Sequence, residues 1–556
     1  MKDQLDGLNR HAKTVAASAI PAPPTAGLQP YTGPWDRPQL VHLLKRTMFG
    51  ARLGDINYFA TKTMEEVVDE LLQPTAAPVL PPLNNYSVDG YIDATGVAPW
   101  QIWVNASPLL YNQELNQKRI ASLQAWWMGQ LLNSQRSIHE KLTLFWHNHF
   151  AVNMNKDASI RAQHWYGHYL SLRNNALGNF TQLVKAVTLD PAMLFFLNGN
   201  TNKKTAPNEN YGRELQELYT IGKGAGSAYT EDDVRAATRV LTGHTVRTDN
   251  YTYFFDAGEH DSDNKLFSAF YSNHIVTGKT GAPGATELDD MLTAIFATEE
   301  AARFICRKLY RFFIYYTIDD AIETNIIIPL ADIFRNNNYN IQPVLSTLFK
   351  SEHFYDLTYS SACVIKSPID LVIGLLREFE VSLPASDNAA GQYDVWALLL
   401  SVCSRQQQQI GAIPEVAGWY AYYLEPSFHE TWINAVTYTE RTIFTDNMIL
   451  QGITQNTATI IIDPIAFATA LPNPGDPNAL MDDSLSILFR YPLSDATKAF
   501  IKQSILLSGQ TTDYYWTNAW DAYISNPNDA MAKSLVQTRL QAFYKYLMNL
   551  PEYHLS

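Results

Sequence analysis

Hydrophobic side chains recur at helical spacing along most of the chain. In "RPQLVHLLKRTMFG", Val41, Leu44 and Met48 fall on one side of a helix that Gly50 can end. "TKTMEEVVDELLQP" repeats the pattern, with a threonine cap, early acids and a closing proline. Similar patterns occupy residues 112–134, 137–154, 159–174 and 178–189, about 286 to 380, and the final "SLVQTRLQAFYKYLMNL". They predict a mainly α, large multi-helix globular fold.

Between residues 250 and 280 the hydrophobic period changes to two. Tyr251, Tyr253 and Phe255 alternate with other residues, and a second alternation over Phe267, Ala269 and Tyr271 follows a polar turn. Period-two alternation on both sides of a turn is typical of a hairpin. We therefore expect a small β-hairpin insertion around residues 250–280.

The positions of the prolines indicate how the chain is organised into a leader and a domain. Residues 1–37 contain five prolines and are predicted to form an extended Pro-rich leader. Residues 38–556 are predicted to form a single large helical domain, with residues 38–380 and 381–556 as candidate sub-lobes.

No stretch reaches the roughly 18 apolar residues of a spanning helix, so no transmembrane segment is expected. The short apolar piece near the N-terminus is a poor signal-peptide core.

Composition and charge narrow the classes of function. Of the 556 residues, 46% are hydrophobic and 17% are charged, which is typical of soluble globular proteins. The formal net charge of −14 argues against a nucleic-acid partner, because neutralising phosphates requires basic patches. The three cysteines indicate neither a disulfide framework nor a zinc site. The sequence contains no P-loop, dinucleotide-binding fingerprint, G-x-S-x-G or HExxH motif.

Two histidines lie two positions apart in "KLTLFWHNHFA". Successive residues of a helix turn by about 100°, so His147 and His149 point about 200° apart and cannot bind one metal ion together. His149 shares a face with Ile138 and Leu142 and is predicted to point inward, whereas His147 is predicted to lie on the wetter side. The inward His149 is either a core histidine satisfied by backbone or a carboxylate, or a ligand or acid–base group.

A second candidate lies in "NENYGRELQELYTIG", a predicted helix that follows a proline and ends at a glycine. Glu214 falls on its apolar face, where a carboxylate is costly unless it is paired. The candidate partners in a structural ion-pair network are Arg213, Arg235 and Arg239. Alternatively, Glu214, flanked by Glu217, joins His149 in a metal or proton-transfer site.

The third candidate is "GEHDSDNK" in the predicted hairpin. Its polar residues either form a solvated turn or carry chemistry. In the second case His260 and Asp261 supply a metal ligand or a His–Asp base, and Lys265 holds an anion. The spacing does not fit a calcium-binding EF-hand loop.

Several blocks of the sequence, in this order, resemble the bacterial domain-of-unknown-function 1800 family over roughly residues 38–556. They are "HLLKRTMFGARLGD", "KLTLFWHNHFA", "NENYGRELQELYTIG", "YTEDDVRAATRVLTG", "HDSDNK", "KSPIDLVIGLLRE", "PEVAGWYAYYLEPSFHETWINAVTYTER" and "RLQAFYKYLMNLPEY". The resemblance implies a mostly helical, often exported protein, hence a periplasmic or exported location, and a sulfatase-like partner protein encoded nearby. It implies no established activity. After "HD" the family tends to show two glycines that this chain lacks.

Two classes of function are open at this point. The first is a metal-assisted hydrolase whose site lies between the central helices and the 255–265 hairpin, and it needs about three metal ligands and one open position. Its catalytic residues would be His149, Glu214, His260, Asp261 and Lys265. One divalent transition metal would be bound by His149, Glu214, Glu217 and His260.

The second class is a non-catalytic binding or assembly protein of the cell envelope that acts with a partner protein. Its contacts would include the aromatic cluster Trp419, Tyr420, Tyr422, Tyr423 and Trp432. The enzyme class requires the histidines and acids to converge within ligand distance. The binding class predicts that they separate into different ion pairs.

Overall fold

The computed structural model describes residues 26–76, 80–88, 90–110, 112–156, 160–357 and 363–556. Residues 1–25 of the predicted leader lie outside the described residues. Residues 26–36 of the leader contain no helix and are held by pairing to a distant segment: Tyr31 N donates to Lys350 O at 2.8 Å, and Pro30 forms a bridge with Ser351. The first helix among the described residues begins at Arg37.

Helices make up most of the described residues, which confirms the mainly α class. The first half of the chain contains α2 (Arg37–Thr47), α3 (Leu53–Phe59), α4 (Met64–Leu71), α5 (Gln113–Leu132), α6 (His139–His149), α7 (Ala162–Asn174), α8 (Phe180–Thr188), α9 (Pro191–Phe196), α10 (Asn210–Glu214) and α11 (Glu231–Val240). The middle contains α12 (Glu287–Ala297), α13 (Glu299–Phe313), α14 (Asp320–Ile322), α15 (Ile328–Asn336), α16 (Ile341–Phe349), α17 (Glu352–Tyr355) and α19 (Pro368–Glu378). The remainder contains α20 (Ala389–Arg405), α21 (Ala435–Leu450), α22 (Pro464–Thr469), α23 (Pro477–Leu488), α24 (Asp495–Phe500), α25 (Tyr514–Ser525) and α26 (Ala530–Met548). A wider turn, η2 (Leu215–Thr220), continues α10, and two short segments, η6 (Tyr420–Tyr422) and η7 (Phe428–Trp432), precede α21.

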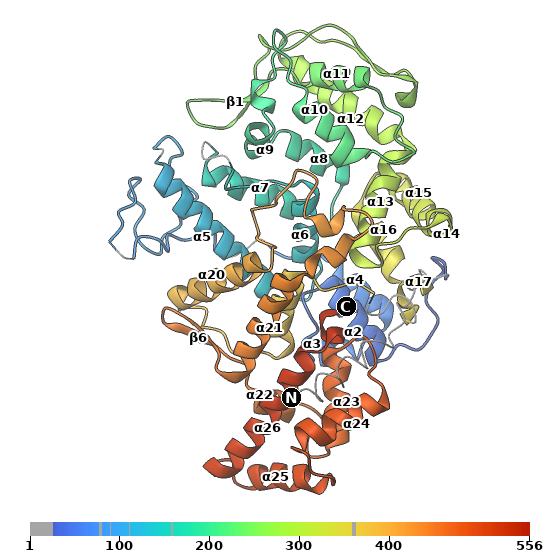
Figure 1. Cartoon of the computed structure of the whole chain (residues 1–556). Helices are drawn as coiled ribbons and strands as arrows, with labels where there is room; N and C mark the ends of the chain where they lie inside the picture. The colour runs from blue at the N-terminus through green and yellow to red at the C-terminus, as the bar shows by residue number, and fades with distance from the viewer. Residues whose placement is uncertain (1–25, 77–79, 89, 111, 157–159, 358–362) are drawn as a thin grey trace.

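The molecule is elongated, and its two ends are formed by different parts of the chain (Figure 1). Helices α8 to α12 build the upper end, α23 to α26 build the lower end, and α6 lies between them. The first described helix, α2, packs against α23 near the middle of the molecule (Figure 1). There Arg46 Nη2 donates to Ser556 O at 2.9 Å.

Local sequence signals account for several helix ends. Thr63 and Glu66 form a capping box at the start of α4, and Thr230 and Asp233 form the predicted one at the start of α11. Gly50 follows α2 with a φ of 77°, a backbone conformation that favours glycine. A Cβ at this position would lie 2.9 Å from Gly374 Cα, so the absence of a side chain also lets this turn approach α19 closely.

The predicted insertion around residues 250–280 contains two small hairpins. Strand β2 (Tyr253–Phe255) pairs with β1 (His244–Val246), and β3 (Lys265–Leu266) pairs with β4 (Ile275–Val276). The expected pairing of the two alternating segments with each other is therefore wrong. The first segment pairs with β1 instead, and the second contains the short helical turn η3 (Ala269–Tyr271) in place of a strand. A third hairpin, β5 (Ile453–Gln455) with β6 (Ala458–Ile460), follows α21.

Helix α6 is buried on all sides, which corrects the prediction for His147. Both His147 and His149 are buried, and His147 is 0% exposed. Gly411 N donates to His147 Nε2 at 3.0 Å, and the ring packs against Trp127 and Trp419. Hydropathy along α6 could not show this, because neighbouring segments cover its polar face as well as its apolar one.

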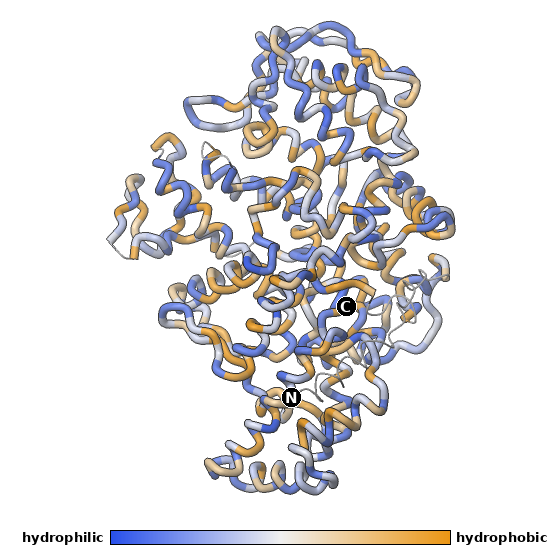
Figure 2. The backbone as a smooth tube through the Cα atoms, viewed as in Figure 1, coloured by the Kyte–Doolittle hydropathy of each residue, from blue (hydrophilic) through white to orange (hydrophobic). Residues whose placement is uncertain are grey.

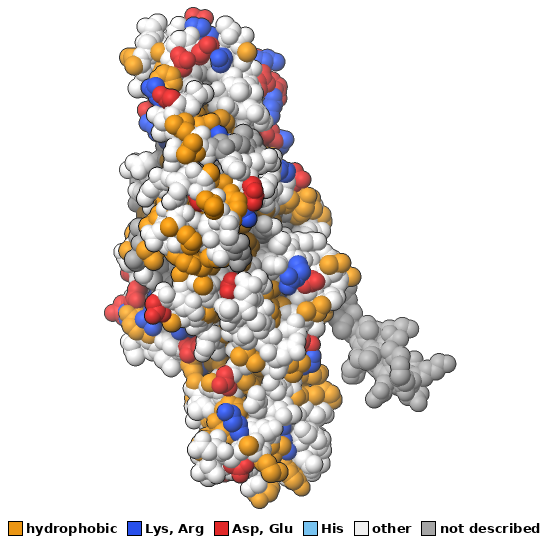
Figure 3. All heavy atoms as spheres, turned by 90° about the vertical axis from the view of Figure 1, so that its left-hand side faces the viewer, with side chains coloured by type: hydrophobic (Ala, Val, Ile, Leu, Met, Phe, Trp, Pro, Cys, Tyr) orange, Lys and Arg blue, Asp and Glu red, His pale blue; other side chains and the backbone are white. Residues whose placement is uncertain are grey.

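Hydrophobic and hydrophilic residues are mixed along the helices (Figure 2), as amphipathic patterns predict. On the face shown in Figure 3, hydrophobic side chains gather over the middle, and acidic and basic side chains are interspersed. Among the described residues, no helix is both long enough and apolar enough to cross a membrane.

Candidate functional site

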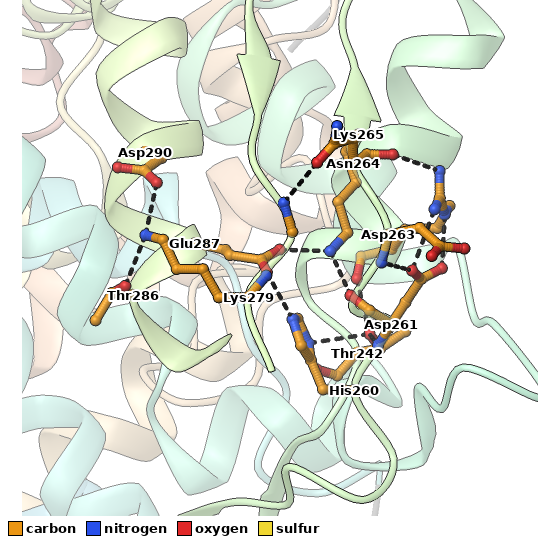
Figure 4. Close-up of polar contacts among 12 residues, drawn as sticks. Thr242, His260, Asp261, Asp263, Asn264, Lys265, Lys279, Thr286, Glu287 and Asp290 are labelled. Carbon is orange, nitrogen blue, oxygen red and sulfur yellow. Dashed lines mark hydrogen bonds and ion pairs between the residues drawn. The ribbon is translucent and has the colours of Figure 1, made fainter. Parts of the chain in front are cut away.

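Three of the predicted site residues meet in a buried ion-pair cluster (Figure 4). Lys265 of β3 and Glu287, the first residue of α12, are both 0% exposed, and Lys265 Nζ lies 2.5 Å from Glu287 Oε2. The other carboxylate oxygen accepts a hydrogen bond from Lys279 N at 2.6 Å and lies 3.0 Å from His260 Nε2. Donors therefore occupy both oxygens of Glu287.

Asp261 belongs to the same cluster but has a different partner. Arg239 of α11 binds it in a bidentate manner, with distances of 2.7 and 3.1 Å to the two carboxylate oxygens. Burial raises the pKa of Asp261, but the hydrogen bonds from Arg239 and from the backbone of Asp263, together with the charges of Arg239 and Lys265, more than offset this effect, and the pKa lies below its usual value. His260 Nδ1 lies 2.8 Å from Thr242 O rather than against Asp261. The predicted His–Asp base is therefore not formed.

The solvated-turn interpretation of this segment is also wrong for His260 and Lys265, since both side chains are buried. Lys265 binds the carboxylate of Glu287 and the carbonyl oxygen of Asp261. The anion that Lys265 was expected to hold is therefore the Glu287 carboxylate of the protein itself. The sequence pattern could not show this, because Glu287 lies on a separate helix.

His149 lies in the central aromatic core. Its Nε2 is 3.0 Å from Tyr219 O, and its Nδ1 is 3.3 Å from Lys308 Nζ. Lys308 must donate to Nδ1, so the ring carries its proton on Nε2. Burial and the neighbouring Lys308 hold the pKa of His149 well below its ordinary value. Both ring nitrogens are occupied, which is the arrangement of a core histidine satisfied by its neighbours.

Glu214 and Glu217 do not reach His149 through any hydrogen bond or ion pair among the described residues. Glu217 pairs with Lys223. Glu214 is half-buried, one of its carboxylate oxygens has no hydrogen-bond partner within the described residues, and burial followed by the charge of Glu217 raises its pKa.

The predicted arginine partners of Glu214 bind other acids instead. Arg213 binds Glu231 at 2.7 Å, and Arg239 binds Asp261. Arg235 binds Asp232 at 2.6 Å. The expected network around Glu214 is therefore wrong.

The residues proposed for a metal site are divided between separate clusters. In the described parts of the chain, no group of three or more His, Cys, Asp or Glu side chains is placed to hold a metal ion. His260, Asp261 and Lys265 come together, whereas His149, Glu214 and Glu217 lie in other surroundings. The convergence that the hydrolase hypothesis requires is not found there, and the individual roles of these residues stay predictions.

A different group of ionisable side chains lines a small, partly open cavity of about 50 Å³. Its lining residues come from α2, α6, α13, α19 and the segments η6 and η7, and Ser556 at the end of the chain also lines it. Its cationic lining residues are Lys45, Arg46, Lys141, Arg311 and Lys366. Its carboxylate lining residues among those described are Asp370 and Glu378. Cations thus outnumber carboxylates here, although the chain as a whole carries a net charge of −14.

Most of these cations have partners. Lys45 Nζ lies 2.5 Å from Glu378 Oε1, and Lys141 forms an ion pair with Asp370. Arg311 Nη2 lies 3.4 Å from Glu425, whose carboxylate is exposed. Arg46 donates to Ser556 O, as described above, and to Cys363 Sγ at 3.3 Å.

Lys366 differs from the other cations of the cavity. It is 6% exposed, and no hydrogen bond or ion pair of its Nζ occurs within the described residues. The ammonium group lies over the Tyr553 ring, 4.2 Å from its centre. Burial lowers the pKa of Lys366 to about 7; the charges of Lys45 and Arg441 act in the same direction, while Glu378 and Asp370 oppose them.

The backbone of Lys366 is held from two sides, which fixes the point from which the side chain extends. Its N–H donates to His554 O at 2.8 Å, and its carbonyl oxygen accepts a hydrogen bond from Arg441 Nη2 at 2.9 Å. Arg441 is itself fully buried, and its other guanidinium nitrogens have no acceptor among the described residues. One more positive charge therefore lies behind the cavity.

His429 of η7 adds a neutral donor to the lining. Ile365 N donates to His429 Nδ1 at 3.0 Å, so the neutral ring carries its proton on Nε2. Burial lowers the pKa of His429 to about 4, which keeps the ring neutral near pH 7. Cations and a neutral N–H donor together suit a ligand with an anionic group.

A wider groove of about 370 Å³ adjoins the cavity, and the two share Ala421 and Trp432 as lining residues. Trp419 and Trp432 are buried, whereas Tyr420 is 43% exposed. Much of the aromatic cluster is therefore core wall, and Tyr420 turns toward solvent at the groove.

Comparison with known proteins adds one finding. The model of the family described as "Protein of unknown function (DUF1800)" matches residues 42–555. The chain belongs to this family. No curated protein and no solved structure matches the chain.

The blocks that carry the DUF1800 resemblance supply most of the cavity. Lys45 and Arg46 come from "HLLKRTMFGARLGD", and Lys366 begins "KSPIDLVIGLLRE". The sequence patterns did not single out these residues. One signal was present in the sequence, since Lys45 and Arg46 directly follow the apolar residues of α2. The structure buries both of them together with the rest of the second half of this helix.

Proposed function

We propose that this DUF1800 protein binds a small anionic compound, bearing a carboxylate, phosphate or sulfate group, in the cavity around Lys366. The observation that carries the proposal is the surplus of buried cations around one cavity, with the Lys366 amine unpartnered among the described residues. It develops the binding class of function. A metal-assisted hydrolase stays an untested prediction with less support, because its residues lie in separate clusters. A sulfatase-like partner stays an expectation from the family resemblance.

The energetic reason is the cost of burying charge. Burying an ion costs several kcal/mol of hydration free energy, and favourable contacts with its surroundings must offset this cost. An anion in the cavity would contact Lys366 directly and would also lie close to the other cations of the lining. The cavity volume of about 50 Å³ exceeds the roughly 10–15 Å³ that one water needs, so a small ligand can enter.

Titration calorimetry with inorganic phosphate, and separately with sulfate and acetate, tests the proposal. At about pH 6.5, below the pKa of Lys366, we expect at least one of these anions to bind. In Lys366→Met its affinity should fall roughly tenfold to a hundredfold, since hydrogen bonds to charged groups are worth about 1.5–3 kcal/mol.

Lys308→Met is the matched control, because burial also lowers the pKa of Lys308 to about 7 while its side chain contacts His149 outside the cavity. This variant should bind the anion as tightly as the unmodified protein. Absence of binding for all three anions, or equal weakening in both variants, would contradict the proposal.

A further inference from the structure

The Lys366 amine has the surroundings of a reactive lysine. Lys366 lines a small cavity, the residue as a whole is 6% exposed, and its Nζ has no hydrogen-bond acceptor within the described residues. Its backbone is fixed on both sides by His554 and Arg441. A lysine that only supports the fold is expected to have a carboxylate partner when buried, as Lys265 has in Glu287.

The other charges around Lys366 are largely engaged elsewhere. Glu378 is bound by Lys45, and Asp370 is bound by Lys141, so neither carboxylate forms an ion pair with Lys366. Arg441 faces the carbonyl oxygen of Lys366 rather than its amine. The amine therefore has cations and paired acids around it, and a ring face, from Tyr553, against it.

We infer that the Lys366 amine forms an imine with a small aldehyde or ketone whose anionic group is held by the neighbouring cations of the cavity. This inference rests on the proposed function and names a substrate class for it, an anionic carbonyl compound. The lowered pKa of Lys366, about 7, supports the inference, because a large fraction of the amine is then unprotonated at neutral pH.

The reaction balances without an oxidant or a reductant. The lone pair of Nζ attacks the carbonyl carbon, the C–N bond forms, and the carbonyl oxygen takes up a proton as the nitrogen loses one. The resulting carbinolamine loses its hydroxyl group, and the second proton of the nitrogen leaves with it as water. The products are the imine, with a C=N bond to Lys366, and one molecule of water.

The cavity size selects the probe. Glyoxylate has an aldehyde carbon next to a carboxylate and is one of the smallest molecules with both groups. Glycolaldehyde is similar in size but uncharged, so it reports on the aldehyde reaction without the anion site.

The experiment is reductive trapping of the full chain with glyoxylate and cyanoborohydride, followed by peptide mass mapping. We expect carboxymethylation of Lys366 ahead of the other lysines, suppressed by whichever of phosphate, sulfate or acetate binds in calorimetry. Glycolaldehyde should modify Lys366 much less. Lys141, in the same cavity but paired with Asp370, is the internal control and should stay unmodified.

The pH profile and a variant give two further readouts. The rate of trapping at Lys366 should rise as the pH increases through about 7, since only the unprotonated amine attacks. Lys366→Arg keeps the charge but offers no amine for a stable imine, so it should lose the labelled site and retain anion binding. The site of labelling is mapped on the protein that carries Lys366, so this readout does not depend on whether the Lys366→Arg variant folds.

The outcomes separate the two proposals. Anion binding without preferential labelling of Lys366 would overturn the imine and leave the proposed function standing. Equal labelling by glyoxylate and glycolaldehyde, without protection by the anion, would also overturn the inference. If the protein neither binds an anion nor is labelled at Lys366, both the proposed function and the inference are wrong.

Discussion

At the scale of single residues, the buried Lys265 and Lys366 and the half-buried Lys308 differ in what surrounds their amines. Lys265 is neutralised by Glu287, whereas Lys308 contacts a neutral histidine and Lys366 faces a cavity. Burial lowers the pKa of both Lys308 and Lys366 to about 7. These two side chains therefore link folding stability to pH.

We expect the free energy of unfolding to rise with pH between about 7 and 10.5. In this interval unfolded Lys366, with its ordinary pKa of 10.5, still holds a proton that the folded protein has released. The unfolded state binds more protons, so stability increases with pH, by at most about 1.4 kcal/mol per pH unit for one group. Urea unfolding at about pH 7.5 and about pH 9.5 measures this slope.

Lys366→Met should reduce the slope, and Lys308→Met should reduce it separately. Both variants should be more stable than the parent near pH 7, where burying a charged lysine is costly. Identical slopes in the parent protein and in Lys366→Met would show that Lys366 keeps its proton in the folded state.

At the scale of elements, one carboxylate joins helix α12 to the hairpin segment. Glu287 binds Lys265 of β3 and lies beside His260, while the next turn of the helix carries Asp290, which binds Lys279 at 2.8 Å near the surface (Figure 4). The same helix thus offers a buried and an exposed ion pair for direct comparison.

Glu287→Gln should lower the free energy of unfolding by about 3–5 kcal/mol, because it leaves Lys265 charged and buried without its partner. Asp290→Asn is the control, and the exposed pair should contribute less than about 1 kcal/mol. Both values come from urea unfolding of the full chain. A loss below about 1 kcal/mol for Glu287→Gln would contradict the structural importance of the buried pair.

Sequence patterns predicted those elements that depend on neighbouring residues. The helices and the capping box of Thr230 and Asp233 follow from residues within a few positions of one another. The partner of β2 was predicted wrongly, because the nearby β1 was not predicted as a strand. The burial of His147 was predicted wrongly because segments from elsewhere in the chain cover it. The ion pair of Lys265 and Glu287 likewise joins two separate elements, and no periodicity along one segment indicates it.

At the scale of the whole molecule, the cavity is assembled from segments that are far apart in the sequence. Lys45 comes from α2, Lys141 from α6, Arg311 from α13 and Lys366 from the segment just before α19, while His429 lies beyond residue 380. Each of these helices contributes only one or two cations to the cavity, which by itself does not stand out in the sequence. The surplus of charge becomes visible only when the segments meet.

This arrangement bears on the prediction of one domain over residues 38–556, with candidate sub-lobes at 38–380 and 381–556. Both candidate sub-lobes contribute side chains to the cavity, so its integrity requires both. We therefore expect one cooperative transition in calorimetric unfolding of the full chain. A bound anion should shift the entire transition upward, by about 2.7 kcal/mol of stability at 100 times its dissociation constant.

In Lys366→Met the transition should stay single but lose most of the shift at the same anion concentration, which separates the effect on binding from any effect on folding. Two transitions, of which the anion moves only one, would show that the sub-lobes unfold independently and that the cavity belongs to one of them. A single transition that moves only in the parent protein would tie the ligand to the packing of both halves, because a ligand stabilises only those parts of a chain that must be folded for it to bind.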